Sequence, residues 1–397
     1  MFGFRNSSKK HLPFPNGKHQ VSCVDVMTEY SKDGVFFRIF YPASTDKKIQ
    51  DEPESWFPWS PHDMYIKGIA SFVNLWAFII RLLVFLYGGT TYVPAFWEEE
   101  PIKDCKMPIV IFSHGFGASR FICSTICSDL ASQGYFVAAV EHRDTSACAT
   151  YYYKSEEDRD NNVRTWVRHN KLNCGPNHYT IRNKQVKFRT EEVIKVMNFL
   201  EEIQDGTAEK IVIPTKFDVL KFKNCLDLSK VALMGHSFGG ATSLLALSMD
   251  SRFKLGIILD AWMFPLKDEK TLKIRQPLLF INSATFHIPS NITAIEAVMA
   301  QPNGAKREIY TIKHSTHETQ TDSPFILGYW LDWFKHKVDP KLGTEINNFL
   351  IQRFLSAHTG VPQNLNTNLD AQDNIYPKYI MEGAVVGADK PRRQFLS

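Results

Sequence analysis

The chain contains 397 residues, and its 46 Lys and Arg against 42 Asp and Glu leave a formal net charge of only +4. This near balance gives no support to a nucleic-acid-binding role, which needs a strongly basic surface. The aromatic content of 13%, with 29 Phe, is high and favours an apolar ligand or a lipid surface.

The first residues are polar and basic and include proline, so we expect a loosely held arm over residues 1–19. They lack the apolar core of a secretory signal, and Phe2 stands where myristoylation needs glycine. Seven scattered Cys, an odd number, favour reduced thiols over disulfides. We therefore expect a cytoplasmic protein with one catalytic domain over residues 20–360 and a polar C-terminal tail over residues 361–397.

Residues 20–43 alternate apolar and polar around an Asp-Gly pair, which predicts a β-hairpin. From residue 108 onward, short apolar runs alternate with helical segments, and this pattern predicts an α/β protein with a mainly parallel sheet covered on both faces. The polar stretches 154–184 and 206–227 are predicted to be insertions at the rim, and a helix is expected at 344–357. The apolar runs are 109–112, 136–140, 231–234, 255–259, 277–281 and 307–312.

Residues 69–87 form the most apolar run and are about as long as a membrane span. On a helix, however, the polar residues of this region fall within an arc of about 80°. Arg81 near the centre of a span would cost roughly 2.5–3.5 kcal/mol. Three placements stay open: in the bilayer interface, buried against the protein, or across the membrane.

Large apolar side chains on this helix and in a second patch at 325–334 are candidates for contact with lipid. They are Trp76, Phe78 and Phe85 in the first segment and Trp330 and Trp333 in the second. We expect these segments to flank one opening and to dock the protein on a lipid surface as a peripheral protein.

The motif Gly235-His-Ser-Phe-Gly239 follows an apolar, strand-like run and precedes a helical one. A serine on such a sharp strand-to-helix turn is exposed at the sheet edge, and the glycines allow the strand and helix to cross closely. The N-terminus of the helix adds N–H groups that can stabilise an oxyanion. Ser237 is therefore the candidate nucleophile.

A serine nucleophile needs a base, and the base needs an acid to orient it. Asp260 directly follows the run 255–259, at the carboxyl end of a strand where α/β proteins place their sites. Asp268, in a charged loop, and Asp322 are weaker alternatives.

Three histidines follow the acid: His287, His314 and His317. His317 comes after the last predicted strand and before a helix, and we favour it as the base, with His314 as the alternative.

The oxyanion hole is expected to use the backbone N–H of Phe238, the residue after the nucleophile, and that of Phe116 in the glycine-containing loop after an earlier strand. His114 in the same loop either orients it or is a structural histidine. No part of the chain has convincing metal-ligand spacing, so we expect no metal or cofactor.

Several blocks of sequence resemble the platelet-activating factor acetylhydrolase family, which includes plasma and intracellular calcium-independent phospholipases. The blocks are FSHGFG at 112–117, DLASQG at 129–134, VAAVEHRD at 137–144, GHSFGGAT at 235–242 and DAWMFPL at 260–266. The similarity extends from about Trp56 to about Phe334.

The resemblance implies an α/β-hydrolase fold and a triad of Ser237, Asp260 and His317, with oxyanion amides at Phe116 and Phe238. It also implies hydrolysis of short or oxidised sn-2 acyl chains of phospholipids without a metal. The secretory leader of the plasma members and the myristoylation start of the intracellular ones are both absent from this sequence.

The expected function is therefore a serine esterase acting on phospholipids at a membrane or lipid-particle surface. A broader lipase or carboxylesterase is the nearest alternative within enzymes. A non-catalytic, lipid-binding member of the fold is the alternative from another class.

Overall fold

A computed structural model describes most of the chain. The described residues are 9–72, 90–103, 105–170, 175–209, 211–269, 272–302, 304–327, 337–363 and 375–384.

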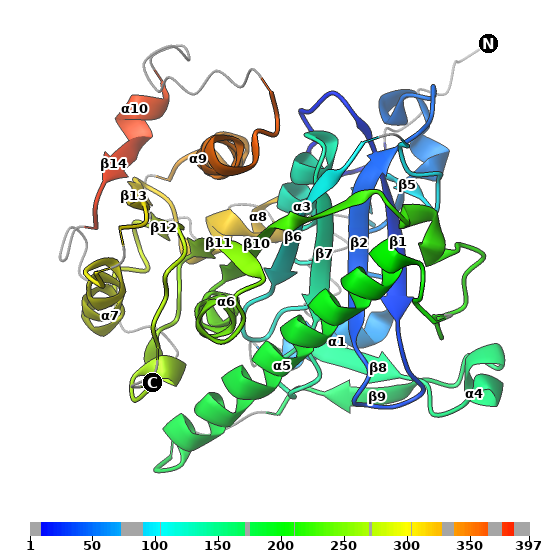
Figure 1. Ribbon diagram of the computed structural model, residues 1–397, viewed down its shortest axis with the longest axis horizontal. Helices are drawn as coiled ribbons and strands as arrows, with labels where there is room; N and C mark the ends of the chain where they lie inside the picture. The colour runs from blue at the N-terminus through cyan, green and yellow to red at the C-terminus, as the bar shows by residue number, and fades with distance from the viewer. Residues whose placement is uncertain are drawn as a thin grey trace, which may run out of the picture.

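The centre of the protein is a ten-stranded sheet in the order β14-β13-β12-β11-β10-β6-β7-β2-β1-β5 (Figure 1). Strands β6, β7, β10, β11, β12 and β13 are parallel to one another, and the hairpin β1–β2 joins β7 antiparallel. This arrangement confirms the predicted hairpin, the apolar runs and the mainly parallel sheet. The strands are β1 (Gln20–Met27), β2 (Phe36–Ala43), β5 (Phe96–Trp97), β6 (Met107–Ser113), β7 (Phe136–Glu141), β10 (Leu226–His236), β11 (Phe253–Leu259), β12 (Leu278–Ser283), β13 (Arg307–Ile312) and β14 (Ile380–Glu382).

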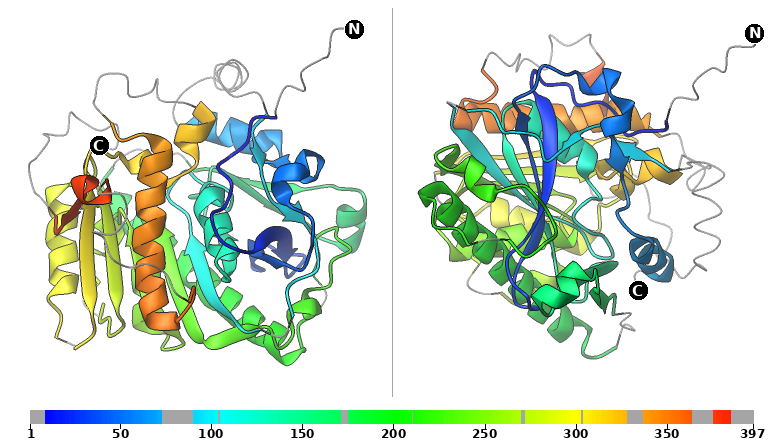
Figure 2. Two further views of the ribbon diagram at one scale, coloured as in Figure 1. Left: turned by 90° about the horizontal axis from the view of Figure 1, so that it is seen from above. Right: turned by 90° about the vertical axis from the view of Figure 1, so that its right-hand side faces the viewer.

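Helices cover both faces of the sheet, because successive strand residues point to opposite sides. In β6, Ile109 and Ile111 belong to the same buried cluster as residues of α5, α6 and α7, whereas Val110 and Phe112 belong to the cluster that contains residues of α3 and α9. Figure 2 shows these helix layers on opposite sides of the sheet. The helices are α1 (Asp63–Phe72), α3 (Ser124–Ser132), α4 (Glu156–Asp160), α5 (His178–Asp205), α6 (Phe238–Met249), α7 (Pro289–Met299), α8 (Ser323–Leu327), α9 (Pro340–Thr359) and α10 (Tyr376–Tyr379).

The polar stretch 154–184 is more regular than the sequence predicts. It contains α4, the strand β9 (Thr165–Arg168), which pairs with β8 (Ala149–Tyr152), and the first turns of α5. Sequence reasoning missed the start of α5 because its inner face carries buried polar side chains, including Arg182 and Gln185, that hydrogen-bond to one another. A second small sheet pairs β3 (Phe57–Pro58) with β4 (Tyr92–Val93).

Both predicted ends of the chain are held to the body where the structure describes them. Leu12, in the expected arm, is fully buried and donates its N–H to Tyr92 O at 2.9 Å. In the expected tail, β14 pairs antiparallel with β13 and extends the sheet by one strand. A strand of three residues carries too little apolar alternation to be recognised in the sequence.

Helix α1 is the described beginning of the apolar segment 69–87. It starts at Asp63, with Tyr65 and Ala70 buried and Lys67 and Ser71 exposed. The polar stripe of this first part therefore faces solvent while the opposite side packs on the protein. Residues 73–89 lie outside the described part of the chain, and so do Trp76, Phe78, Phe85, Trp330 and Trp333. Among the described residues, no helix combines the length and apolarity required to cross a bilayer.

Candidate active site

Ser237 occupies a strained turn between β10 and α6. Its φ of 56° and ψ of −115° lie in a region that residues with a side chain rarely adopt. The turn is held by the serine's own backbone: its N–H donates to Leu259 O at 2.8 Å, and its carbonyl accepts from Gly240 and Trp262, both at 3.0 Å. These bonds stabilise a conformation that places the hydroxyl at the edge of the sheet.

The two glycines of the motif are required by close backbone contacts. A Cβ on Gly239 would lie 1.9 Å from Ser113 O, and one on Gly235 would lie 2.1 Å from Gly239 O. Both distances are far below any real contact, so no larger residue fits. The close approach of Gly239 to Ser113 also places the start of α6 directly against the end of β6. The loop that contains Phe116 follows β6.

Asp260 and His317 are brought together from the ends of different strands. Asp260 follows β11, is fully buried, and accepts a hydrogen bond from His317 Nδ1 at 3.0 Å. Ser283, the last residue of β12, donates its N–H at 2.6 Å and its hydroxyl at 2.5 Å to the same carboxylate. Burial would raise the pKa of Asp260, but the hydrogen bonds and charge of His317 and the bonds from Ser283 outweigh it and lower the pKa. The group is therefore a carboxylate, and it holds His317 with its proton on Nδ1.

The ring of His317 lies between two other rings. Phe286 stacks on one side with centroids 4.0 Å apart, and His236 lies on the other at 4.4 Å. Burial and the neighbouring His317 lower the pKa of His236 to about 3, so this ring is neutral. A neutral neighbour does not oppose a positive charge on His317, and the two contacts restrict its rotation.

Ser237 and His317 both keep access to solvent. Ser237 is 8% exposed, and the His317 side chain is 24% exposed. Within the described residues no hydrogen bond joins the serine hydroxyl to the His317 ring. Such bonds are often long in the absence of substrate and shorten when it binds.

The alternative acids and bases occupy other positions. Asp322 is buried and accepts from Trp59 Nε1 and from the first two N–H groups of α3, so it caps that helix. Asp268 is exposed at the surface. His287 contacts Thr311, at 3.2 Å, and the ring of His314 lies near Tyr379, and neither histidine hydrogen-bonds to Asp260.

The site also brings together donor atoms with the spacing of a metal centre. Ligand atoms of His236, Asp260 and His317 lie within 4.8 Å of one another. Asp260 and His317 are bonded to each other, and His236 Nε2 lies 3.2 Å from the His317 carbonyl. The Asp260–His317 bond already uses the carboxylate and Nδ1, and His236 Nε2 faces a carbonyl, so the geometry favours a hydrogen-bonded pair over a metal site.

Two backbone N–H groups are available near Ser237. Phe238 is the first residue of α6, and a Cβ on Gly115, the residue before Phe116, would lie 3.2 Å from Ser237 Cβ. Among the described residues, neither the N–H of Phe116 nor that of Phe238 has a hydrogen-bond acceptor. The predicted oxyanion donors therefore lie on two segments that meet at the serine.

Residues 4–378 match the model of the family described as platelet-activating factor acetylhydrolase, isoform II. The chain belongs to this family.

The named acetylhydrolase relatives cover nearly the whole chain. The platelet-activating factor acetylhydrolases of Bos taurus and Gallus gallus are each 36% identical to it, over 91% and 93% of this chain and 80% and 88% of their own lengths. A putative phospholipase A2 of Schizosaccharomyces pombe is 25% identical over 94% of this chain and 98% of its own. The solved ferulic acid esterase from Streptomyces cinnamoneus shares the fold, with a TM-score of 0.63, 17% identity, and coverage of 94% of this chain and 99% of its own. The α/β-hydrolase fold predicted from the sequence is confirmed.

A cluster of aromatic rings lies next to the serine turn of this acetylhydrolase-family chain, since Phe238 follows Ser237 and Trp262 N–H donates to Ser237 O. Trp262 lies 5.4 Å from the Phe238 ring and 6.1 Å from the Phe116 ring, and Phe116 and Phe238 are also 6.1 Å apart. Phe72, at the end of α1, lies 5.6 Å from Phe116. The guanidinium of Arg182 covers the Phe116 ring at 4.0 Å. Rings from three parts of the chain, α1, the Phe116 loop and the segment after Asp260, therefore meet beside the start of α6.

Sequence reasoning missed a second Ser–His–carboxylate set behind the site. Ser113 Oγ lies 2.8 Å from His142 Nε2, and His142 Nδ1 lies 2.7 Å from Glu192. Ser113 is 1% exposed and His142 fully buried, so this set has no access to substrate. Sequence reasoning also missed Ser283 and Phe286, although Ser283 could have been found as the polar residue at the end of an apolar run.

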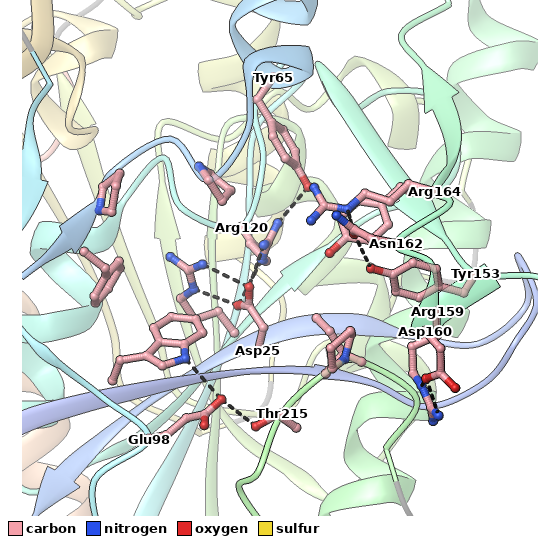
Figure 3. Close-up of a pocket in the computed structure, with 18 residues that line it drawn as sticks. Asp25, Tyr65, Glu98, Arg120, Tyr153, Arg159, Asp160, Asn162, Arg164 and Thr215 are labelled. Atoms are coloured by element: carbon pink, nitrogen blue, oxygen red, sulfur yellow. Dashed lines mark hydrogen bonds and ion pairs between the residues drawn. The ribbon is translucent and has the colours of Figure 1, made fainter. Parts of the chain in front are cut away.

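The structure has a separate cavity of about 810 Å³, whose lining includes none of the three predicted triad residues. Figure 3 shows Asp25 and Arg120 bonded at its wall. Arg120 also donates to the hydroxyl of Tyr65 at 2.8 Å, and Asp25 accepts from Arg38 at 2.7 Å. Burial alone would raise the pKa of Asp25, but the arginines outweigh it and hold the pKa well below its usual range. This ion network ties α1 to the segment that follows the Phe116 loop.

Proposed function

We propose that the chain is a serine esterase that hydrolyses the short sn-2 acyl ester of platelet-activating factor and related phospholipids. His317 Nε2 takes the proton of Ser237 as its hydroxyl attacks the ester carbonyl, and the N–H groups of Phe116 and Phe238 stabilise the oxyanion. The same proton then passes to the leaving alkoxide, and an acyl-enzyme remains. Water, deprotonated by His317, releases the acid and restores Ser237.

The single observation that carries this proposal is the Asp260–His317 hydrogen bond of 3.0 Å, which leaves Nε2 with its lone pair. Family membership and the names of the relatives support the phospholipid substrate. The ring of Trp262, 6.1 Å from that of Phe116 and 5.4 Å from that of Phe238, supports a preference for short acyl chains because a large ring on the residue that bonds Ser237 O leaves less room for a long chain.

An acyl-length series on the purified protein tests the substrate class. We expect kcat/KM to be highest for acetyl and to fall with unbranched acyl length on a constant phospholipid backbone. Equal rates for long chains and for simple esters would instead favour a general carboxylesterase. An organophosphonate should label Ser237, and no labelling of a folded sample would favour a non-catalytic lipid-binding protein.

We also propose that the protein docks on lipid surfaces through the segments that contain Trp76, Phe78, Phe85, Trp330 and Trp333. Support comes from the sequence and from Phe72, the last described residue of the first segment (69–87), whose ring lies 5.6 Å from that of Phe116. Burying a few hundred Å² of apolar area provides several kcal/mol at about 25 cal/mol per Å², enough for reversible adsorption.

Vesicle flotation with wild type, Phe85→Ala and Trp330→Ala tests this docking. Weaker flotation of both variants, with normal activity on a monomeric substrate, is expected. Flotation unchanged in both would refute docking through these segments. A protein that only detergent extracts would show a membrane span.

A further inference from the structure

His114 is a fully buried histidine in the loop that carries Phe116. Its Nε2 accepts the backbone N–H of His142 at 3.2 Å, and its Nδ1 lies 2.8 Å from Gly115 O. Burial and the nearby charge of Arg189 hold the pKa of His114 well below its ordinary value, so the ring is neutral. Because Nε2 accepts a hydrogen bond, the single ring proton lies on Nδ1, which donates to Gly115 O.

This bond determines the direction of an adjacent N–H group. Gly115 C=O and Phe116 N–H belong to one planar peptide unit, and in a trans unit they point in opposite directions. Ala118 N–H also donates to Gly115 O, at 3.3 Å. Because these two donors hold the Gly115 carbonyl, the Phe116 N–H of the same peptide unit must point in the opposite direction, away from them.

The preceding peptide unit is held as well. Arg189 on α5 is fully buried and donates to His114 O, and its guanidinium lies 4.5 Å from the centre of the Phe238 ring. Its Nε and Nη1 are buried without an acceptor among the described residues. The guanidinium of Arg189 therefore holds the loop in place. Its buried positive charge also favours the oxyanion that forms when Ser237 attacks the ester.

Glu192 anchors His142, whose backbone N–H determines the tautomer of His114. Its two carboxyl oxygens bond His142 Nδ1 at 2.7 Å and Arg143 N–H at 2.9 Å. His142 in turn bonds Ser113, the last residue of β6. The backbone N–H that donates to His114 Nε2 belongs to His142, and His142 is held both by Glu192 of α5 and by Ser113 of the sheet.

We propose that His114 is a positioning residue of the oxyanion hole: its Nδ1–H orients the Gly115–Phe116 peptide so that the Phe116 N–H points at the developing oxyanion. The inference rests on the proposed esterase mechanism. His114 is itself too buried to touch substrate, so its effect falls on kcat and not on KM.

The test compares His114→Asn with His114→Gln. An Asn amide nitrogen can occupy the place of Nδ1 and donate to Gly115 O, whereas a Gln amide nitrogen lies near the place of Nε2 and cannot. We expect Gln to lower kcat and the rate of Ser237 phosphonylation by about 10²–10³-fold, the loss typical of one oxyanion donor, with KM unchanged. Asn should stay within about tenfold of wild type.

His358→Gln is the matched control, because His358 Nδ1 also bonds a backbone carbonyl, that of Phe354 at 3.1 Å, but at the C-terminal end of helix α9, beside Lys306 and Glu308. It should keep wild-type kcat. Thermal unfolding measured alongside restricts the comparison to folded enzyme.

Equal kcat in the Asn and Gln variants, or a change confined to KM, would overturn the inference while leaving the esterase mechanism intact. Wild-type protein that no phosphonate labels would overturn the mechanism, and this inference with it.

Discussion

The substitution Asp260→Asn tests the triad most sharply, because it changes one atom in a site whose hydrogen bonds are defined. Ser283 N–H donates to one carboxyl oxygen at 2.6 Å, so the Asn oxygen keeps that position. The new NH₂ group then faces His317 Nδ1 across 3.0 Å. Two donors cannot share a hydrogen bond, so the ring proton must move to Nε2, the atom that has to accept the proton of Ser237.

The wrong tautomer should lower kcat by about 10⁴-fold, which corresponds to ~5.5 kcal/mol of transition-state stabilisation. The measurement is acetyl release from a platelet-activating factor analogue, together with thermal unfolding to verify the fold. Asp268→Asn is the control, since this exposed residue was the alternative acid, and it should retain wild-type kcat. A folded Asp260→Asn enzyme with more than a tenth of wild-type kcat would refute the assigned role of Asp260.

Four further predictions follow from the same geometry. Ser237→Ala should abolish turnover without lowering the unfolding temperature by more than a few degrees, and near-normal hydrolysis would remove the serine from the mechanism. His317→Ala should be as inactive as the serine variant, since triad members act as a unit, whereas His314→Ala should remain active. The reverse result would make His314 the catalytic base in place of His317. Activity should persist in excess chelator, and a loss restored by added calcium would contradict a triad mechanism. Asp25→Asn should lower the free energy of unfolding at pH 7 by about 3–5 kcal/mol, because it leaves the buried Arg38 without its carboxylate partner and Arg120 paired with Glu141 alone. Because the folded-state pKa of Asp25 lies below its usual value, this difference from wild type should shrink as the pH falls below about 4, and a constant difference would show that the ion pairs are not its source.

Local sequence determines the turn at Ser237. Glycines at 235 and 239, an apolar run before and a helix-forming run after are enough to specify a strand, a tight turn and a helix, because each depends on residues within a few positions. The same reasoning predicts Asp260 at a strand end and the hairpin of residues 20–43. These features depend on backbone geometry and on the alternation of apolar residues, which the sequence displays directly.

Tertiary structure alone decides which distant side chains meet. His314 and His317 are three residues apart, and only the course of the chain after β13 brings His317 to Asp260. The stacking of Phe286 on that ring, and the burial of Arg189 beneath the Phe116 loop, join residues far apart in the chain. Contacts of this kind depend on strand order and helix placement, which no local pattern encodes. Polar residues such as those of α5 look like surface in a sequence, and only their hydrogen-bond partners in the folded protein allow them to be buried.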